Sequence, residues 1–256
     1  MITKKQLINE IININIKPTD TLLIHSSLKS LGYVEGGATT VVEAFMEVVN
    51  NGLLIFPTHT WGIIREDNQI FDVKETQSNL GAIPNAALNT NKFIRSNHPT
   101  HSVCAYGEKA LEYTKLDDNA ITPCGPNCCF GALKNMNAKI LFLGAPLSKN
   151  TFIHSIEEEM NVPDRFTSHI YNFYTKDVNN DIINYNMPRH YSTKSPHISD
   201  HYEKLLPVLM SNNIAKKVKL GESTSYLVDA NKCYNLVKNL LKENIHIFDD
   251  FTPIKL

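Results

Sequence analysis

The amino-acid sequence predicts an α/β protein with a three-layer α/β/α core and a smaller α+β portion at the carboxyl end. Short apolar runs, such as residues 21–25 and 139–143, have the length and composition of buried strands. Segments with apolar side chains at helical spacing separate these runs, and such alternation is typical of a parallel sheet covered by helices. We expect one domain over residues 1–256, with a core over residues 3–165 and the smaller portion over residues 166–256.

The first elements form a strand-helix-strand unit. Residues 3–15 place their aliphatic side chains on roughly one side of a helix, which ends before Pro18. A strand over residues 21–25 follows, then a helix that opens around residues 35–40 and runs to about residue 50. The next strand covers residues 53–57. Because parallel strands need a crossover connection, this unit indicates a sheet with helices on its faces.

The rest of the chain adds strands and helices in a less regular order. Residues 62–82 are polar and poorly periodic, which favours a surface excursion with some exposed strand over residues 70–73. Two short runs on either side of Asn179 favour an antiparallel hairpin. The remaining expected elements are hairpin strands over 170–175 and 182–187, strands over 103–106, 215–220 and 223–228, and helices over 81–89, 108–114, 130–135, 199–210 and 230–244, with one more from about residue 151.

Composition excludes several classes of protein. Hydrophobic residues make up 42% and charged residues 20% of the chain, as in ordinary globular proteins. No apolar run reaches the roughly 18 residues that a membrane span needs. The amino terminus lacks the apolar core of a signal peptide, so we expect a cytoplasmic protein without a membrane partner. A formal net charge of −1 offers no general attraction to nucleic acid.

The five cysteines do not form a recognisable framework. Their number is odd, so reduced thiols are expected. Cys124, Cys128 and Cys129 have the spacing of half a zinc site, but a structural zinc site usually needs two separated ligand pairs. The sequence holds no second pair, and we expect no metal there.

A histidine and a carboxylate share one face of the helix after residues 139–143. His154 precedes Glu157 by three residues and Glu158 by four, spacings that bring side chains together on a helix. The alternative is an exposed hydrogen-bonded pair on the helix surface without a catalytic role, and the spacing alone favours this alternative. Position favours a catalytic base, because the positive helix terminus disfavours imidazolium and the carboxylate can fix the tautomer.

The connection after the first strand suits an anion. Glycines at Gly36-Gly37 let backbone amides approach a phosphate at a helix amino terminus, and Lys29 adds a positive charge. The alternative is a plain glycine turn capped by Thr39. Neither the Walker pattern nor G-x-G-x-x-G is present. Ligands gather at the carboxyl ends of parallel strands, so we expect this connection, residues 58–61 and the turn after Leu143 to converge.

Three histidines offer a different chemistry. His59, His98 and His101 provide imidazoles that could bind a metal, although no acidic residue accompanies them at ligand spacing. A rigid turn around Pro99, in which imidazoles bond to backbone groups, is the simpler alternative for at least one of them. A metal-dependent hydrolase built on these residues stays open as an alternative function.

Three motifs in order and spacing resemble the aminoglycoside 3-N-acetyltransferase family over about residues 3–248. They are LIHSSLKSLG followed by VEGGA, RSNHPTHS followed by Ala105 and Gly107, and LGAPL followed by Thr151, His154 and Glu157. The resemblance implies an α/β/α core, a coenzyme A cleft beside the first strand-helix connection, and direct acetyl transfer from acetyl-CoA to an amine without a metal.

The resemblance also implies roles for individual residues. His154 is expected to be the general base, Glu157 its carboxylate partner, and His98 a residue that lines the site. Those expected to bind coenzyme A are His25, Ser26, Ser27, Lys29, Gly36, Gly37, Thr39 and Ser102. Those expected to bind the acceptor amine are Thr58, Trp61, Glu158 and Asp164.

Two departures from the family pattern leave the acceptor open. Cys128-Cys129 stands where the family tends to show a Ser-Pro pair, and the segment after Trp61 lacks the acidic and aromatic run of antibiotic-resistance members. The expected acceptor is therefore an aminoglycoside or an amino sugar of surface-polysaccharide biosynthesis. A non-catalytic coenzyme A or sugar binder is a further alternative. The oligomeric state is open, with a homo-oligomer among the allowed states.

Overall fold

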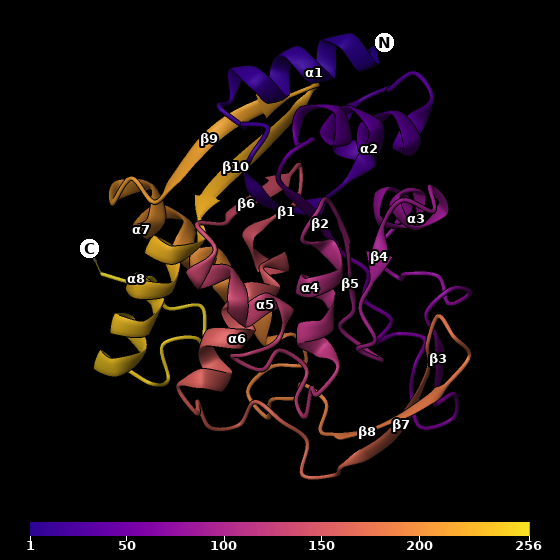
Figure 1. Cartoon of the computed structure of the whole chain (residues 1–256). Coiled ribbons are helices and arrows are strands. Elements are labelled where there is room, and N and C mark those ends of the chain that lie inside the picture. Colours follow the sequence, from indigo (N-terminus) through magenta and orange to yellow (C-terminus); the bar gives the residue numbers. More distant parts are fainter. Residues whose placement is uncertain (256) are drawn as a thin grey trace.

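A seven-stranded sheet forms the middle of the molecule (Figure 1). The computed structural model describes residues 1–255. The strand order is β4-β5-β2-β1-β6-β10-β9. The strands are β1 (Thr21–Ser26), β2 (Leu53–Pro57), β4 (Ile94–Arg95), β5 (Val103–Tyr106), β6 (Lys139–Leu143), β9 (Ala215–Leu220) and β10 (Ser223–Asp229).

Three parallel strands, β2, β1 and β6, occupy the centre of this sheet. Leu23 of β1 lies opposite Ile55 of β2 and Ile140 of β6. β5 is antiparallel to β2, and β10 is antiparallel to β6, so the sheet changes direction on both sides of the centre. The carboxyl ends of the three central strands therefore meet at one edge, where α/β proteins place their ligands.

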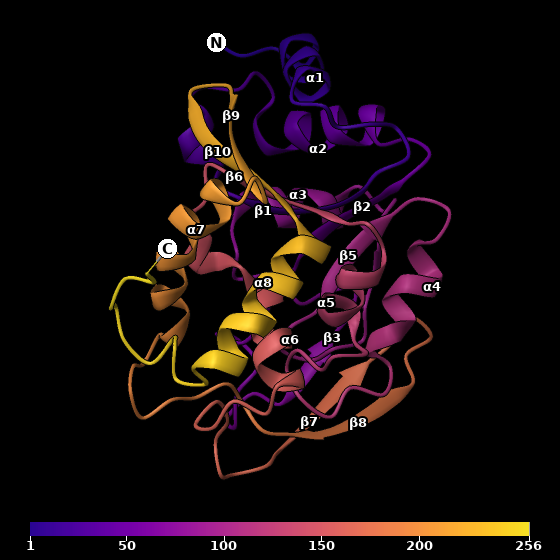
Figure 2. The same ribbon diagram turned by 90° about the vertical axis from the view of Figure 1, so that its left-hand side faces the viewer.

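Helices cover both faces of the sheet, which confirms the predicted α/β/α class. Leu22 and Ile24 of β1 pack in a cluster with α1, α2 and α3, whereas Leu23 packs on the other face with α4 to α8. Figure 2 shows α1 and α2 on one side of the strands and α5, α6 and α8 on the other. The helices are α1 (Lys4–Asn13), α2 (Gly37–Val48), α3 (Ala82–Asn89), α4 (Ala110–Thr114), α5 (Cys129–Ala132), α6 (Thr151–Glu159), α7 (Leu205–Ser211) and α8 (Ala230–Glu243).

A second, three-stranded sheet packs at one end of the molecule (Figure 1). It consists of β3 (Ile70–Asp72), β7 (Tyr171–Lys176) and β8 (Ile182–Met187), and Phe71, Phe173 and Tyr185 form much of its core. The predicted hairpin of β7 and β8 is confirmed. The parallel pairing of β3 with β7 was not predicted, because the two strands lie far apart in the sequence.

The last third of the chain completes the central sheet. The predicted strand pair is present as β9 and β10, and β10 pairs directly with β6. The central sheet therefore continues past residue 165. The helix predicted over 199–210 is split into a 3-10 helix, Ile198–Lys204, and α7. Pro207 is the third residue of α7, where a backbone N–H has no partner within the helix. Within residues 1–255, no helix has the length and apolar composition to cross a membrane.

Candidate active site

A cavity of about 570 Å³ opens at the edge where the parallel strands end. Ser26 ends β1 and Ser27 follows it, Trp61 follows β2 and Pro146 follows β6, and all of them line the cavity. The three loops expected to converge thus contribute to one wall. Five histidines also line it: His25, His59, His101, His154 and His190.

His154 reaches the cavity from α6, and its side chain is 13% exposed. Its Nδ1 lies 3.3 Å from Glu157 Oε2 and 2.8 Å from the hydroxyl of Tyr202. The contact between His154 and Glu157 follows from their helical spacing. Tyr202 could not be anticipated, because it comes from the 3-10 helix before α7 and is brought in by tertiary packing.

Hydrogen bonding fixes which nitrogen of His154 carries the proton. Tyr202 has one hydroxyl proton and donates it to Glu157 Oε2. The Tyr202 oxygen therefore accepts from Nδ1–H of His154, which also lies close to Glu157. The lone pair is left on Nε2, which has no hydrogen-bond partner within residues 1–255. A neutral imidazole in this tautomer can accept a proton from a molecule in the cavity.

Glu157 is a buried carboxylate, only 1% exposed. Arg165 Nε donates to Glu157 Oε1 at 2.7 Å, and Arg165 Nη2 donates to Asp249 at 2.9 Å. Burial acts to raise the pKa of Glu157, but the hydrogen bond from His154 and the charge of Arg165 outweigh it and lower this pKa. Glu157 therefore stays ionised and can stabilise a positive charge on His154.

A second imidazole-carboxylate pair lies beside the first. The ring centroids of His154 and His190 are 4.2 Å apart, with 30° between the planes. His190 Nε2 lies 2.9 Å from Glu158 Oε1, which also accepts from the backbone N–H of Cys124 at 2.8 Å. Burial raises the pKa of Glu158 to about 7 and holds the pKa of His190 well below its usual value. Near pH 7 His190 is therefore neutral, whereas Glu158 is close to half-protonated.

Replacing Glu158 by glutamine is expected to stabilise the protein in alkaline but not in acidic solution. Folding raises the pKa of Glu158 from 4.5 to about 7. The unfolded chain therefore ionises first, and stability falls as the pH rises through this interval. Glutamine cannot ionise, so the gain should approach about 3 kcal/mol at about pH 8.5 and vanish near about pH 4.5. Urea unfolding at these two pH values measures it.

Glu159 provides a matched control, because replacing it by glutamine should change stability in the opposite direction at alkaline pH. Burial opposes ionisation, but hydrogen bonds from Lys134 and other neighbours lower the pKa of Glu159 to about 2. Its ionised form therefore stabilises the folded chain above the unfolded pKa, and this contribution is lost in acid. Glu159→Gln should destabilise the protein at about pH 8.5. A Glu158→Gln variant that behaves like Glu159→Gln would show that Glu158 carries no burial penalty.

His98 supports a turn and does not line the cavity. Its Nδ1 accepts from the N–H groups of Thr100 at 3.2 Å and His101 at 3.0 Å, and its Nε2 lies 3.2 Å from the carbonyl oxygen of Thr122. Both ring nitrogens are occupied, so His98 has no free lone pair for a metal. A metal-dependent hydrolase built on His59, His98 and His101 would therefore lack its third metal ligand. The ring centroids of the other two histidines are 4.8 Å apart.

The loop after β1 and the start of α2 differ from a capped turn. Gly36 and Gly37 have φ values of +73° and +63°, left-handed conformations that favour glycine. Gly36 is the N-cap of α2, and no side chain of the described residues caps the helix, so Thr39 does not act as a cap. Lys29 is exposed near this connection.

Several predicted site residues lie outside the cavity wall. Thr58 and Ser102 are buried and bond to each other through their hydroxyl groups at 2.9 Å. Asp164 accepts three hydrogen bonds from the loop at residues 192–193. Their predicted roles in binding stay predictions, as do those of the other residues outside the wall: Lys29, Gly36, Gly37, Thr39, His98, Glu157 and Glu158.

The aminoglycoside 3-N-acetyltransferase family model matches residues 23–242. The chain belongs to this family. The predicted resemblance is thereby confirmed, and the match contains every predicted site residue of the chain.

Relatives within the family align with most or nearly all of this chain. Aminoglycoside N(3)-acetyltransferase IX of Micromonospora chalcea is 25% identical over 268 residues and covers 95% of each chain. The SPbeta prophage-derived aminoglycoside N(3')-acetyltransferase-like protein YokD of Bacillus subtilis is 28% identical over 179 residues, which are 60% of this chain and 64% of YokD.

Solved structures of family members have the same fold. Aminoglycoside acetyltransferase AAC(3)-Xa superimposes with a TM-score of 0.82 at 21% identity, covering 95% of this chain and 94% of that one. AAC-IIIb in a binary complex with CoASH superimposes with a TM-score of 0.80 at 19% identity, covering 94% and 96%. Similarity at this level extends the fold assignment to nearly the whole chain.

Proposed function

We propose that this chain transfers the acetyl group of acetyl-CoA to a primary amine of an aminoglycoside or a related amino sugar. One observation carries the proposal: His154 lines the cavity with a free lone pair on Nε2, while Glu157 and Tyr202 hold its other nitrogen. Family membership supports acetyl-CoA as the donor. The reaction also supports the cytoplasm as the compartment, since acetyl-CoA is available there.

Acetyl transfer requires one proton acceptor and one proton donor. An ammonium ion cannot attack a thioester, so the acceptor must first release one proton to solvent, which leaves a neutral amine. The amine nitrogen then bonds to the acetyl carbon, the carbon-sulfur bond breaks, and coenzyme A leaves as a thiolate. In the proposed mechanism His154 Nε2 accepts the proton of the attacking amine and returns it to the thiolate. Glu157 stabilises the intermediate imidazolium.

The loop after β1 is the proposed place for coenzyme A. Ser26-Ser27 lies in the cavity wall, and the exposed Lys29 comes two residues after Ser27 in the chain. The first amides of α2, at Gly36-Gly37, add the positive end of a helix dipole outside the wall. Lys149 lines the cavity from the neighbouring loop after β6 and supplies a second cation for an anionic donor.

The charge of the cavity wall favours an acceptor with few positive charges. Lys149 and Arg189 line it, and none of its lining residues within the described chain is Asp or Glu. A polycationic aminoglycoside gains most from carboxylates at close range. We therefore keep an amino sugar with a single amine as the second candidate acceptor, beside the aminoglycosides that family members are named for.

A panel of amines tests the proposed function. The purified chain is incubated with acetyl-CoA and either mono-amino sugars or aminoglycosides, among them apramycin and a gentamicin, which are bound in structures of a relative. We expect mass spectrometry to find one added acetyl group on at least one amine, with an equal release of free thiol. Binding of coenzyme A without any product would favour the non-catalytic binder. Neither binding nor product would reject the proposal.

A further inference from the structure

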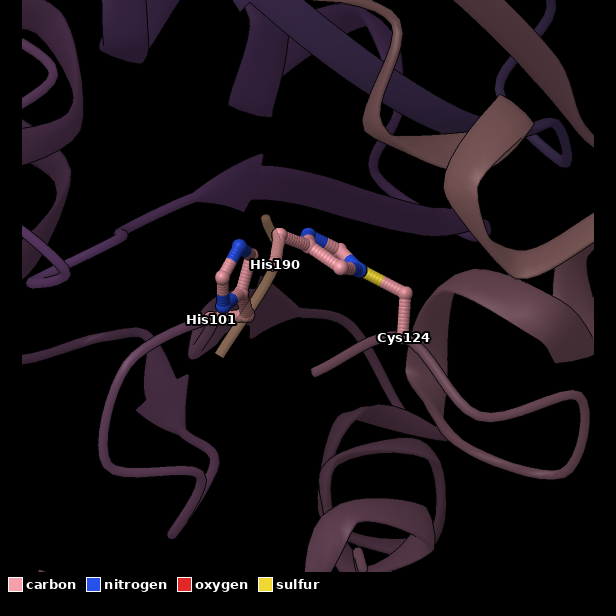
Figure 3. Close-up of side chains that lie close together, drawn as sticks. All are labelled: His101, Cys124 and His190. Atoms are coloured by element: carbon pink, nitrogen blue, oxygen red, sulfur yellow. The ribbon is translucent and has the colours of Figure 1, made fainter. Parts of the chain in front are cut away.

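Three side chains with metal-binding atoms meet at one wall of the cavity, and two of them line it. His101 comes from the turn between β4 and β5, Cys124 from the loop before α5, and His190 from the segment after β8. One ligand atom from each residue lies within 4.8 Å of the other two. Figure 3 shows the imidazole of His190 between His101 and the thiol of Cys124.

Each of these residues retains an unused donor atom. His101 Nδ1 lies 3.0 Å from the hydroxyl of Thr100, which leaves Nε2 without a hydrogen-bond partner in the described part of the chain. Nδ1 of His190 and Sγ of Cys124 likewise make no hydrogen bond anywhere in residues 1–255. His101 and His190 line the cavity, so their unpartnered nitrogens, together with the nearby thiol of Cys124, are open to a ligand that all three residues can share.

The donor set selects a particular class of ion. Two neutral imidazoles and one thiolate suit borderline to soft cations, of which zinc is the most common in proteins, and disfavour magnesium and calcium. Zinc sites commonly include a carboxylate that holds a metal-binding histidine from outside, and Glu158 is placed to do this. It accepts a hydrogen bond from His190 at 2.9 Å, as outer carboxylates do for metal-bound histidines. One thiolate and one carboxylate also balance the charge of a divalent ion.

We propose that His101, Cys124 and His190 bind one zinc ion, with the fourth position of the ion open to the cavity. Bond lengths of about 2.0–2.3 Å place tetrahedral ligands roughly 3.5 Å apart, so the side chains must close by roughly 1 Å on binding. The site is separate from the base, because neither His154 nor Glu157 takes part in it. Acetyl transfer does not need this ion.

The ion would act on the proposed reaction as an inhibitor. His101 and His190 both line the cavity, and His190 packs against His154 with a centroid distance of 4.2 Å and 30° between the ring planes. An ion held there occupies space beside the base and repels the ammonium form of the acceptor. This consequence rests on the proposed function, whereas the binding site itself does not.

Cobalt(II) tests the binding site independently of activity. The chelator-treated full chain is titrated with cobalt(II), and the near-ultraviolet band of a cobalt-thiolate bond is followed. We expect the band to saturate at one ion per chain, to disappear in Cys124→Ser and to persist in Cys128→Ser, whose thiol lies outside the set. Absence of the band in the unchanged chain, or its presence in Cys124→Ser, would overturn the proposal.

Two further variants test the zinc site independently, in case Cys124→Ser does not fold. His190→Ala should abolish tight zinc binding measured by calorimetry, and Glu158→Gln should weaken it by about 10–100-fold. In kinetic assays zinc should inhibit the unchanged chain and Cys128→Ser, while Cys124→Ser should keep its rate. Equal inhibition of all three would contradict the proposed consequence. If no amine is acetylated, the cobalt titration still decides whether the site exists.

Discussion

Replacing His154 by alanine is expected to lower kcat for acetyl transfer by about 10²–10⁴-fold. Within residues 1–255, the variant removes the only imidazole whose Nδ1 is held by both Glu157 and Tyr202, and with it the free Nε2 in the cavity. The KM for acetyl-CoA should change little, because the base acts on the amine. Steady-state kinetics with the best acceptor of the amine panel measures both constants.

Two comparisons make this result specific to the proton acceptor. Free imidazole added to His154→Ala should restore part of the rate, since the cavity then holds a diffusible base. Tyr202→Phe should lose less activity than His154→Ala, because Glu157 Oε2 still lies 3.3 Å from Nδ1. His246→Ala, at a side chain that is 59% exposed, serves as the control for loss of a histidine. An unchanged kcat in His154→Ala would reject His154 as the base.

The central strands and the layers could be predicted from sequence, but the order of the strands could not. Runs such as residues 53–57 are apolar throughout, which marks a strand buried on both faces. The pairing of β10 with β6, and of β3 with β7, joins segments far apart in the chain. Local patterns carry no information about such partners. The expected boundary near residue 165 illustrates this limit, since the strands after it belong to the central sheet.

The candidate site shows the same division between local and distant contacts. The pair of His154 and Glu157 follows from spacing on one helix. Tyr202 approaches that helix from a 3-10 helix, and Arg165 and His190 approach it from irregular segments. No local pattern in the sequence indicates that these three residues meet His154 and Glu157. Arg165 carries one weak signal, because a buried carboxylate such as Glu157 requires a cationic or hydrogen-bonding partner somewhere.

Replacing Arg165 by methionine is expected to destabilise the protein by about 3–5 kcal/mol near pH 7. The side chains of Arg165 and Glu157 are 2% and 1% exposed, so the variant leaves a buried carboxylate without its cation. The folded-state pKa of Glu157 is lowered, so its ionised form adds stability above the unfolded value of 4.5. That stability is lost as the pH falls through the lowered pKa. Urea unfolding should therefore show the largest difference near neutral pH and a smaller one in acid.

A double-mutant cycle with Glu157→Gln separates the charge from the packing of Arg165. Adding Glu157→Gln to Arg165→Met should recover part of the lost stability, because the unpaired charge is gone. Arg65→Met is the surface control: Arg65 is 56% exposed and lies 3.5 Å from Asp67, so its loss should change stability by less than about 0.5 kcal/mol. If Arg165→Met costs no more than Arg65→Met, the buried ion pair does not support the fold. A double variant that regains stability without regaining kcat would show that the Glu157 carboxylate serves His154 as well as the fold.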